Sequence, residues 1–564
     1  MDTAPKLMYE WKNLPWRKLE VQVFKLQKRI YQASIRGDVK TVRRLQRLLI
    51  KSRAAKLLAV RKVTQDNRGK STACVDGVKN LHHPQRLQLA QKLKLPTKVM
   101  PIRRVWIPKL SQDEKRPLGI PTIRDRAAQA LAKLALEPEW EARFEPHSYG
   151  FRPGRSAHDA VKYLFLSIRR QDKYVLDADI SKCFDRINHN ALLSKLNTFP
   201  LMRRAIKAWL KSGVMEENNL FPTNEGTPQG GVLSPLLANV ALHGLEEYIQ
   251  SAFPKRKLIV GVKEANWKPI IVRYADDLII MHRDEQELKR ASYLAQKWLE
   301  KMGLELSPTK TRICHTFKED SEEKPGFDFL GFTFQQYPLG KRNRRFVAGN
   351  GYRREVLHKT IITPTGKAIK RHKAKLSQII DGLKTAPQSR LIRELNPVIT
   401  GWATYYSAVN SKEIFGEIDH WLFIKLRRWA NRRHPMKSKH WIAGKYWGID
   451  TKGVWEFTDG ADSLKNHRET PIRMHVNVKE ARSPFDGDWT YWSKRTGEYP
   501  GIRPILTSML KSQKGRCPCC NLYFHREDII EVHHIDGNRS NRKFANLQAL
   551  HGHCHDTQDG IEVL

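Results

Sequence analysis

The chain has 564 residues, 40% of them hydrophobic, and carries 101 lysines and arginines against 58 aspartates and glutamates. This length exceeds the roughly 250–300 residues at which single cores stop growing, so we expect several packed domains and exclude a disordered chain. The net charge of +43 points to a polyanionic partner, nucleic acid before an anionic membrane, and no apolar run reaches the ~18–20 residues of a spanning helix.

The first ninety residues are predicted to be mostly helical, because their apolar positions recur at three- and four-residue steps. The polar stretch "TQDNRGKSTACVDG" then predicts a loop. From residue 103 to about residue 334, short β-branched runs alternate with helical patterns, which indicates a mixed α/β region. The sequence lacks a charged-then-apolar secretory signal at its start, so we expect an intracellular protein.

The second half of the chain changes character twice. From about residue 340 to 440, strongly basic stretches are interleaved with tryptophan and tyrosine, which predicts a small helical domain with a basic face. The segment "ARSPFDGDWTYWSKRTGEYPGIRP" then predicts irregular structure or a small separate unit. Four of the seven cysteines lie between residues 517 and 554, which favours a metal site over a disulfide framework.

Two adjacent carboxylates interrupt the apolar run "IIVRYADDLII". Asp276 and Asp277 stand where a buried strand pair tolerates charge only beside a cation. Mg²⁺ prefers carboxylate oxygens, and two such ions can clamp an in-line phosphoryl displacement. The stretch "YVLDADISKCFDRINH" supplies a third carboxylate, Asp179, at the end of a predicted strand. We therefore expect these two stretches to pair and to form one Mg²⁺ site.

Six sequence blocks in order resemble the fingers and palm of a reverse transcriptase. They are "RPLGIPTIRDRAAQ", "SYGFRPGRSAHDAV", "GTPQGGVLSPLLANVAL", the "YADD" hairpin, "LELSPTKTRI" and "FDFLGFTF". The second and third are close to the form seen in group II intron-encoded proteins. The resemblance implies a right-hand polymerase fold for residues 1–345.

The resemblance also implies roles for individual residues. Asp179 and Asp276 would bind the two Mg²⁺ ions, and Asp277 completes the site. Lys109 and Arg126 would hold the triphosphate of the incoming nucleotide, with Arg103 and Arg116 as weaker candidates. Gln229 would lie along the nucleotide, and Cys183 or Phe184 would line its ribose. Lys310 would donate a proton to the pyrophosphate. Asp177 and Asp185 are expected to be structural.

The basic helical region is expected to form the thumb, residues 346–455. Its motif "LNPVITGWATYYS" resembles the maturase domain, or domain X, of the same proteins, which implies binding of intron RNA and promotion of splicing. Lysine and arginine would neutralise RNA phosphates in a salt-dependent way. Trp402, Tyr405 and Tyr406 recur at helical spacing, so we predict that they belong to the core rather than stack on bases.

The terminal cluster has the spacing of a structural zinc site. Cys517 and Cys520 form one knuckle, and His551 and Cys554 form a second, which together give the four ligands of a closed Zn²⁺ site. His553 is an alternative to His551 with a poorer spacing. Cys519 is left over and is expected to pack.

Between the knuckles, "EVHHIDGNRSNRKFANLQAL" resembles an HNH endonuclease with a ββα-metal core. The resemblance makes His533 and His555 ligands of one divalent ion, expected to be Mg²⁺, and makes His534 the general base that activates water. Asn546 would brace the loop. We assign residues 511–564 to this nuclease and 456–510 to a DNA-binding segment; the alternative is a zinc ribbon that only binds DNA.

The sequence thus predicts a multidomain α/β chain: right-hand polymerase fingers and palm, helical thumb/maturase domain, small DNA-binding segment and zinc-stabilised ββα-metal HNH nuclease. Its expected partners are the group II intron RNA lariat, target DNA and dNTPs, and no membrane. It would copy RNA, assist splicing and nick target DNA for target-primed reverse transcription. The alternatives are a maturase with little polymerase activity and another class of reverse transcriptase. We expect a cytoplasmic protein in bacteria or an organellar one, and leave the oligomeric state open, with a monomer in the ribonucleoprotein as one option.

Overall fold

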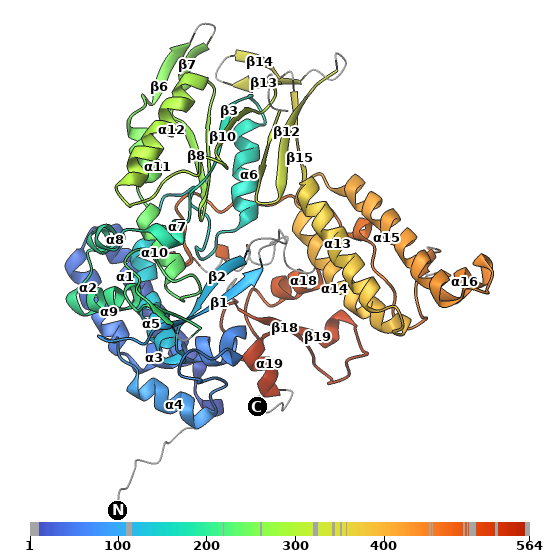
Figure 1. The fold of residues 1–564 in the computed structure, drawn as a ribbon, viewed down its shortest axis with the longest axis horizontal. Coiled ribbons are helices and arrows are strands. Elements are labelled where there is room, and N and C mark those ends of the chain that lie inside the picture. Colours follow the sequence, from blue (N-terminus) through green and yellow to red (C-terminus); the bar gives the residue numbers. More distant parts are fainter. Residues whose placement is uncertain are drawn as a thin grey trace, which may run out of the picture.

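The computed structural model describes residues 11–108, 115–217, 219–259, 262–319, 325–340, 345–349, 352–356, 358–449, 453, 455–488, 491–492, 495, 504–524 and 528–558. N-terminal helices lead into a mixed α/β body, a helical arm follows, and a small unit ends the described chain (Figure 1). In this part of the chain no helix combines the length and apolarity needed to cross a membrane.

The N-terminal region is helical, as predicted. Asp38 caps its second helix by accepting a hydrogen bond from the Thr41 amide at 3.0 Å. Apolar faces of these helices share one core with a long helix of the next region, α5 (Ile123–Glu141). The elements are η1 (Trp11–Asn13), α1 (Trp16–Ile35), α2 (Val39–Lys51), α3 (Arg53–Arg61), η2 (Lys62–Asp66), η3 (Arg68–Ser71) and α4 (His83–Lys92).

A first sheet, in the order β2-β1-β4-β5, stands where the fingers are expected. Its strands are β1 (Ile102–Pro108), β2 (Lys115–Ile120), β4 (Val214–Glu216) and β5 (Asn219–Phe221). The chain between β2 and β4 forms α5 and then, after the first palm elements, α8 (His189–Leu196) and α9 (Pro200–Leu210). The small sheet therefore joins segments more than ninety residues apart in the sequence.

A second, antiparallel sheet in the order β10-β3-β9-β8 forms the centre of the palm. Alternate residues of β9 enter different cores: Leu278 and Ile280 pack with the N-terminal helices, and Ile279 and Met281 pack on the other face. Burial on both faces explains why this strand reads as a continuous apolar run. The strands are β3 (Tyr174–Asp179), β8 (Ile270–Tyr274), β9 (Asp277–His282) and β10 (Arg312–His315), with helices α6 (Ala157–Ile168), α7 (Cys183–Arg186), α10 (Ser234–Leu242), α11 (Leu245–Ser251) and α12 (Glu285–Glu300) around them.

A third sheet connects the palm to the helical arm. The motif "FDFLGFTF" forms a tight hairpin in which the Phe327 and Phe334 rings stack at 4.8 Å. Its strands are β11 (Phe327–Phe329), β12 (Phe332–Pro338) and β15 (His358–Pro364). Two further hairpins project nearby in Figure 1, β6 (Arg256–Ile259) with β7 (Val262–Asn266) and β13 (Arg345–Gly349) with β14 (Tyr352–Val356).

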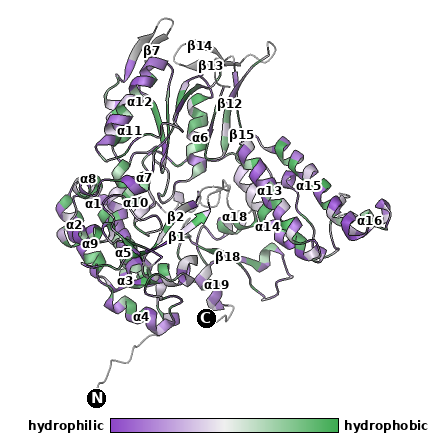
Figure 2. Cartoon of the chain, viewed as in Figure 1, coloured by the Kyte–Doolittle hydropathy of each residue, from purple (hydrophilic) through white to green (hydrophobic). Residues whose placement is uncertain are grey.

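The helical arm confirms the predicted basic helical region from Gly366 onward, but the prediction was wrong for residues 345–364, where the described residues form strands β13, β14 and β15 because they pair with one another and with β12. Each of its long helices alternates hydrophilic and hydrophobic residues (Figure 2). The aromatic residues are core, as predicted: Trp402 stacks on His372 at 4.5 Å, Tyr405 donates to the Leu330 carbonyl at 3.1 Å, and Tyr406 is 5% exposed. The elements are α13 (Gly366–Gly382), α14 (Gln388–Tyr406), α15 (Lys412–Arg433), α16 (Lys439–Tyr446), β16 (Trp447–Ile449) and β17 (Trp455–Phe457).

Residues 467–488 form an irregular strap that returns from the helical arm to the palm. It contains only the short turns η5 (His467–Glu469) and η6 (Pro484–Asp486). Residues 481–488 agree with the predicted irregular structure, and most of the rest of that predicted segment, up to residue 504, lies outside the described residues. Asp159 on α6 is fully buried, and its Oδ1 accepts hydrogen bonds from His475 Nε2 and the Val478 amide, both at 2.9 Å. The strap is therefore packed against the mixed α/β body.

The last described residues form a small unit with its own core. An antiparallel pair, β18 (Ile530–His534) and β19 (Leu547–His551), is followed by α19 (Gly552–Gln558) in a ββα arrangement. Helix α18 (Pro504–Ser512) and the turn η7 (Phe544–Asn546) complete it. Its buried side chains are Met509, Leu510, Cys517, Phe524, Leu547, Ala549, Leu550 and Cys554.

Candidate functional site

The backbone of the palm brings the three predicted carboxylates together. Asp179, the last residue of β3, is paired with Asp277, the first residue of β9. The Ile180 amide donates to the Asp276 carbonyl at 3.1 Å, so Asp276 lies on the same tip. The expected pairing of the two acidic stretches is therefore confirmed, while the role of each carboxylate stays a prediction.

The turn before these aspartates needs special residues. Ala275 has a φ of +59°, in the left-handed region that side chains rarely adopt. Gly150 lies against this turn so closely that a Cβ there would meet the Ala275 amide nitrogen at 2.4 Å. The glycine of "SYGF" is thus required by the close approach of two backbones.

Negative charge is concentrated at this tip. Burial, followed by the charges of Asp276 and Asp179, raises the pKa of Asp277 to about 7. Lys310 forms an ion pair with Asp179, and this contact raises the pKa of the lysine. Three carboxylates gathered at one tip form a set of hard oxygen ligands that fits divalent cations such as Mg²⁺.

Arg273, which the sequence did not single out, fixes the acidic turn. Its Nη1 donates to Asn239 Oδ1 at 3.0 Å and to the Ala275 carbonyl at 3.1 Å, and its Nη2 donates to Ser148 Oγ at 2.6 Å. The side chain is 4% exposed. The one sequence signal that could have identified Arg273 is its charge inside an apolar strand, three positions before Asp276.

The "TPQGG" loop is held between fingers and palm. Gln229 Nε2 donates to both carboxylate oxygens of Asp185 at 3.2 Å, and its carbonyl accepts from the Gly119 amide on β2 at 2.5 Å. The Thr227 amide donates to the Phe184 carbonyl at 2.5 Å. Asp185 is thus a local partner, as expected, and it orients the predicted nucleotide-binding glutamine.

The two residues predicted to line the ribose, Cys183 and Phe184, are adjacent in the chain and contact different neighbours. Cys183 is 3% exposed, and burial raises the pKa of its thiol to about 12, so it is an inert apolar side chain. The Phe184 ring meets the Phe151 ring edge-on at 6.0 Å, and Phe151 is 49% exposed. Phe184 itself is also buried, at 8% exposed, so which of the two residues contacts the ribose stays a prediction.

The four basic residues predicted to bind the triphosphate have different surroundings in the structure. Arg126 directs its guanidinium to three backbone carbonyls, those of Pro121, Gly69 and Thr72, at 2.7–3.0 Å, which favours a role in fixing the loop before α4. Arg103 has a buried Nε with no hydrogen-bond partner among the described residues. Arg116 is described only as the backbone partner of Ile107 on β1, and Lys109 lies outside the described residues.

The four predicted zinc ligands converge in the terminal unit. One ligand atom from each of Cys517, Cys520, His551 and Cys554 lies within 4.8 Å of the others. Asp528 Oδ2 lies 3.3 Å from His551 Nε2, in the place of the outer carboxylate that orients a ligating histidine. The set fits a closed tetrahedral Zn²⁺ site. The expectation that Cys519 packs is wrong: its side chain is exposed, since the four converging side chains already fill the cluster.

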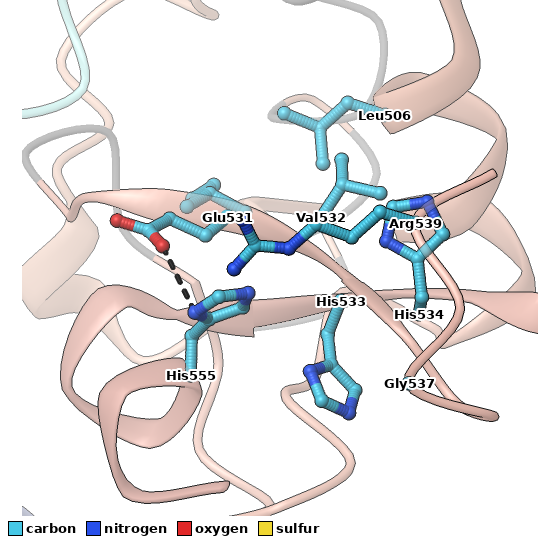
Figure 3. A pocket seen from close by; sticks show the side chains of 9 residues that line it. Leu506, Glu531, Val532, His533, His534, Gly537, Arg539 and His555 are labelled. Atoms are coloured by element: carbon cyan, nitrogen blue, oxygen red, sulfur yellow. Dashed lines mark ion pairs between the residues drawn. The ribbon is translucent and has the colours of Figure 1, made fainter. Parts of the chain in front are cut away.

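A pocket of about 450 Å³ lies beside the histidine strand (Figure 3). The rings of His533 and His555 lie 5.3 Å apart, and His555 Nδ1 pairs with Glu531 Oε2 at 3.2 Å. Glu531, His555 and Asp556 also bring one ligand atom each within 4.8 Å of one another. The two acids were missed by the sequence analysis. The lining residues are Leu506, Ile530, Glu531, Val532, His533, His534, Gly537, Arg539 and His555.

Asn546 holds the loop between the two strands of this unit. Its Nδ2 donates to Asp536 Oδ1 at 2.8 Å and to the Asn541 carbonyl at 2.9 Å, and its Oδ1 accepts from the Asp536 amide at 3.0 Å. The side chain thus has the bracing contacts that the resemblance implied. His534 ends β18, and its neighbour His533 points to the other side of the strand, since successive side chains alternate.

Family models match three parts of the chain. Residues 107–334 match the reverse transcriptase (RNA-dependent DNA polymerase) model, residues 11–93 match the N-terminal domain of reverse transcriptase, and residues 369–447 match the maturase-specific domain of group II introns. The first range contains all the predicted palm carboxylates. The terminal Cys/His unit lies beyond all three matched ranges.

Curated relatives agree with these models. Group II intron-encoded protein LtrA of Lactococcus lactis subsp. cremoris is 38% identical, with 83% of this chain and 86% of the relative covered. Protein YkfC of Escherichia coli K12 is 31% identical over 51% of this chain and 82% of the relative. Maturase-like protein 1 of Euglena gracilis is 28% identical over 58% of this chain and 65% of the relative. The chain therefore belongs to the family of group II intron-encoded reverse transcriptases with a maturase domain.

Proposed function

We propose that this reverse transcriptase copies intron RNA from a nick that it makes itself in target DNA. The polymerase site is formed by Asp179, Asp276 and Asp277, and the observation that supports it is the register that joins the ends of β3 and β9. Bound Mg²⁺ would neutralise the developing charge and lower the pKa of the primer 3′-hydroxyl. The residues of the chain orient the ions and the incoming dNTP.

Each neighbouring residue then has a part in the transfer. Gln229, fixed by Asp185, would lie along the nucleotide, and Phe184 would face its ribose. Lys310, which pairs with Asp179, would donate a proton to the departing pyrophosphate. Arg273 holds the turn that carries the aspartates and is a positioning residue.

Primer extension on a long RNA template with Mg²⁺ tests the polymerase assignment. Asp276→Asn should abolish extension while the protein stays folded, because the amide cannot replace an anionic ligand. The matched control is Asp328→Asn, an exposed aspartate on the β11–β12 hairpin, which should extend normally. Full extension by Asp276→Asn would remove the palm carboxylates from the reaction.

The maturase region would bind the intron RNA and promote its splicing. From His420 to Ile449 the chain has eight lysines and arginines and no acidic residue, and most of these cations are exposed on α15 and α16. Cationic side chains on helices bind phosphates by releasing counterions. RNA affinity of the full chain should therefore fall steeply as the salt concentration rises.

The terminal unit would nick target DNA as an HNH nuclease. His533 and His555, with Glu531 beside them, would hold one divalent ion, and His534 would act as the general base. The zinc cluster would hold the fold of the unit. The supporting observation is the ββα arrangement with an open pocket at its histidine strand, which a zinc ribbon that only binds DNA does not need.

A nicking assay with the ribonucleoprotein and its DNA target tests this part. His534→Ala should lose bottom-strand nicking and keep primer extension on a substrate that is already nicked. Asp328→Asn, the exposed aspartate on the β11–β12 hairpin, is the control that should keep both activities. Unchanged nicking by His534→Ala would exclude this histidine as the general base.

A further inference from the structure

The terminal unit touches the N-terminal helices through a buried arginine. Arg61, the last residue of α3, is 4% exposed, and its guanidinium contacts Nδ1 of His553 on α19. The two residues are 492 positions apart in the sequence. Figure 1 shows α19 near the N-terminal helices, away from the palm sheet.

Arg61 is held on its other sides by residues of the N-terminal region. It forms ion pairs with Glu20 at 3.3 Å and Asp66 at 3.6 Å, and its guanidinium lies 4.7 Å from the centre of the Trp16 ring. Burial raises the pKa of Glu20 to about 7, although Arg61 works to lower it, and Asp528 of the terminal unit is close enough to raise it further. Arg61 is thus a buried cation among carboxylates, with Glu20 and Asp66 from the N-terminal region and Asp528 from the terminal unit.

His553 belongs to the zinc knuckle without being one of its four converging ligands. It stands between His551 and Cys554 in the chain, and its ring stacks on that of His551 at 5.2 Å with an interplanar angle of 12°. A zinc ion bound to the ligands on both sides would fix this ring. The position of the Arg61 contact therefore depends on the knuckle.

The contact leaves the proposed nuclease pocket open. All the residues that line the pocket belong to the terminal unit, and none comes from α1 or α3. The contact also buries Arg61 instead of offering it to a DNA phosphate. Docking of this kind positions the nuclease and does not block it.

We propose that the zinc knuckle is the docking element that seats the terminal unit on helices α1 and α3, with Arg61 and His553 as the central contact. Zinc then has two effects: it folds the unit, and it holds the unit at one place on the polymerase. DNA bound in the histidine pocket is thereby kept in a fixed position relative to the palm. This inference goes beyond the proposed nuclease activity, since the docking itself does not require cleavage.

Hydrogen exchange measured by mass spectrometry on the full-length, zinc-loaded protein tests the docking from both sides. Arg61→Ala should speed exchange in β19 and α19 by roughly tenfold, and His553→Ala should do the same in α1 and α3. Each variant should retain the zinc content of the unaltered protein. Arg53→Ala, an exposed arginine at the start of α3, is the matched control and should change neither region.

Docking differs from a simple loss of structure because each variant must affect the part of the chain on the other side of the contact. If Arg61→Ala affects only the N-terminal helices and His553→Ala affects only the terminal unit, the proposal is overturned. Removal of zinc with a chelator supplies the third arm: α1 and α3 should exchange as fast as in His553→Ala. Unchanged exchange in α1 and α3 after zinc loss would show that the knuckle is not the docking element, whether or not the unit cleaves DNA.

Discussion

At the scale of single residues, the palm site depends on residues that hold the acidic turn in place. Gly150 allows one backbone to approach the turn at Ala275, and Arg273 ties the same turn to Ser148 and Asn239. The aspartates could be predicted from the sequence because charge within an apolar run is itself a signal. The role of Arg273 could not, since its partners are brought to it only by the tertiary fold.

Replacing Gly150 tests the close approach. In Gly150→Ala the new Cβ would lie 2.4 Å from the Ala275 amide nitrogen, so the turn carrying Asp276 must shift. We expect primer extension to fall by at least about tenfold, because misplacement of about 1 Å at a reacting centre is enough for such a loss. Gly401→Ala, in the open middle of α14 with no atom within 4 Å of a new Cβ, should keep full activity and gain slightly in stability. Equal activities of the two variants would contradict the steric argument.

At the scale of elements, periodicity predicted the N-terminal helices and the basic helical arm, and alternation with turns predicted the mixed α/β body. The pattern also placed Trp402 and Tyr406 in the core. What it could not predict is which distant segments meet. His372 on α13 hydrogen-bonds His467 of η5 at 2.7 Å, and His467 pairs with Asp419 on α15 at 2.6 Å.

This buried chain of polar groups should give the helical arm a dependence on pH. Burial, followed by the charge of His467, lowers the pKa of His372 to about 3, from 6.5. Between these values the unfolded chain binds a proton that the folded chain does not, so stability falls as the pH drops below about 6.5. In His372→Gln the slope of unfolding free energy against pH between 4 and 6 should decrease by about one proton, or ~1.4 kcal/mol per pH unit. Urea unfolding at several pH values measures it, with His440→Gln as the exposed control, and an unchanged slope would contradict a buried neutral His372.

At the scale of the whole molecule, the strap ties the chain that follows the helical arm back to the palm. Asp159 on α6 accepts from His475 and the Val478 amide, and it also pairs with Arg495 farther along the chain. Arg155 donates to the Pro146 carbonyl of the palm at 2.6 Å and to the Glu480 carbonyl of the strap at 2.5 Å. The segment that the resemblance assigned to DNA binding therefore uses several of its polar groups for internal contacts.

Asp159 is the residue whose loss should release the strap. Burial alone would raise its pKa, but the His475 hydrogen bond and the Arg495 charge outweigh burial and hold the pKa well below its usual range. Stability from this carboxylate is thus present above the unfolded pKa of 3.8 and is lost as the pH falls below that value. Asp159→Asn leaves a buried arginine without its anion, which costs about 3–5 kcal/mol. We expect trypsin to cut after Lys479 and Arg482 much faster than in the unaltered protein, while Asp381→Asn, at the exposed end of α13, leaves the rate unchanged. Equal cleavage rates in Asp159→Asn and the unaltered protein would mean that the strap is held by apolar contacts, chiefly those of Pro484 and of the nearby Trp492 with Gly154, rather than by the carboxylate.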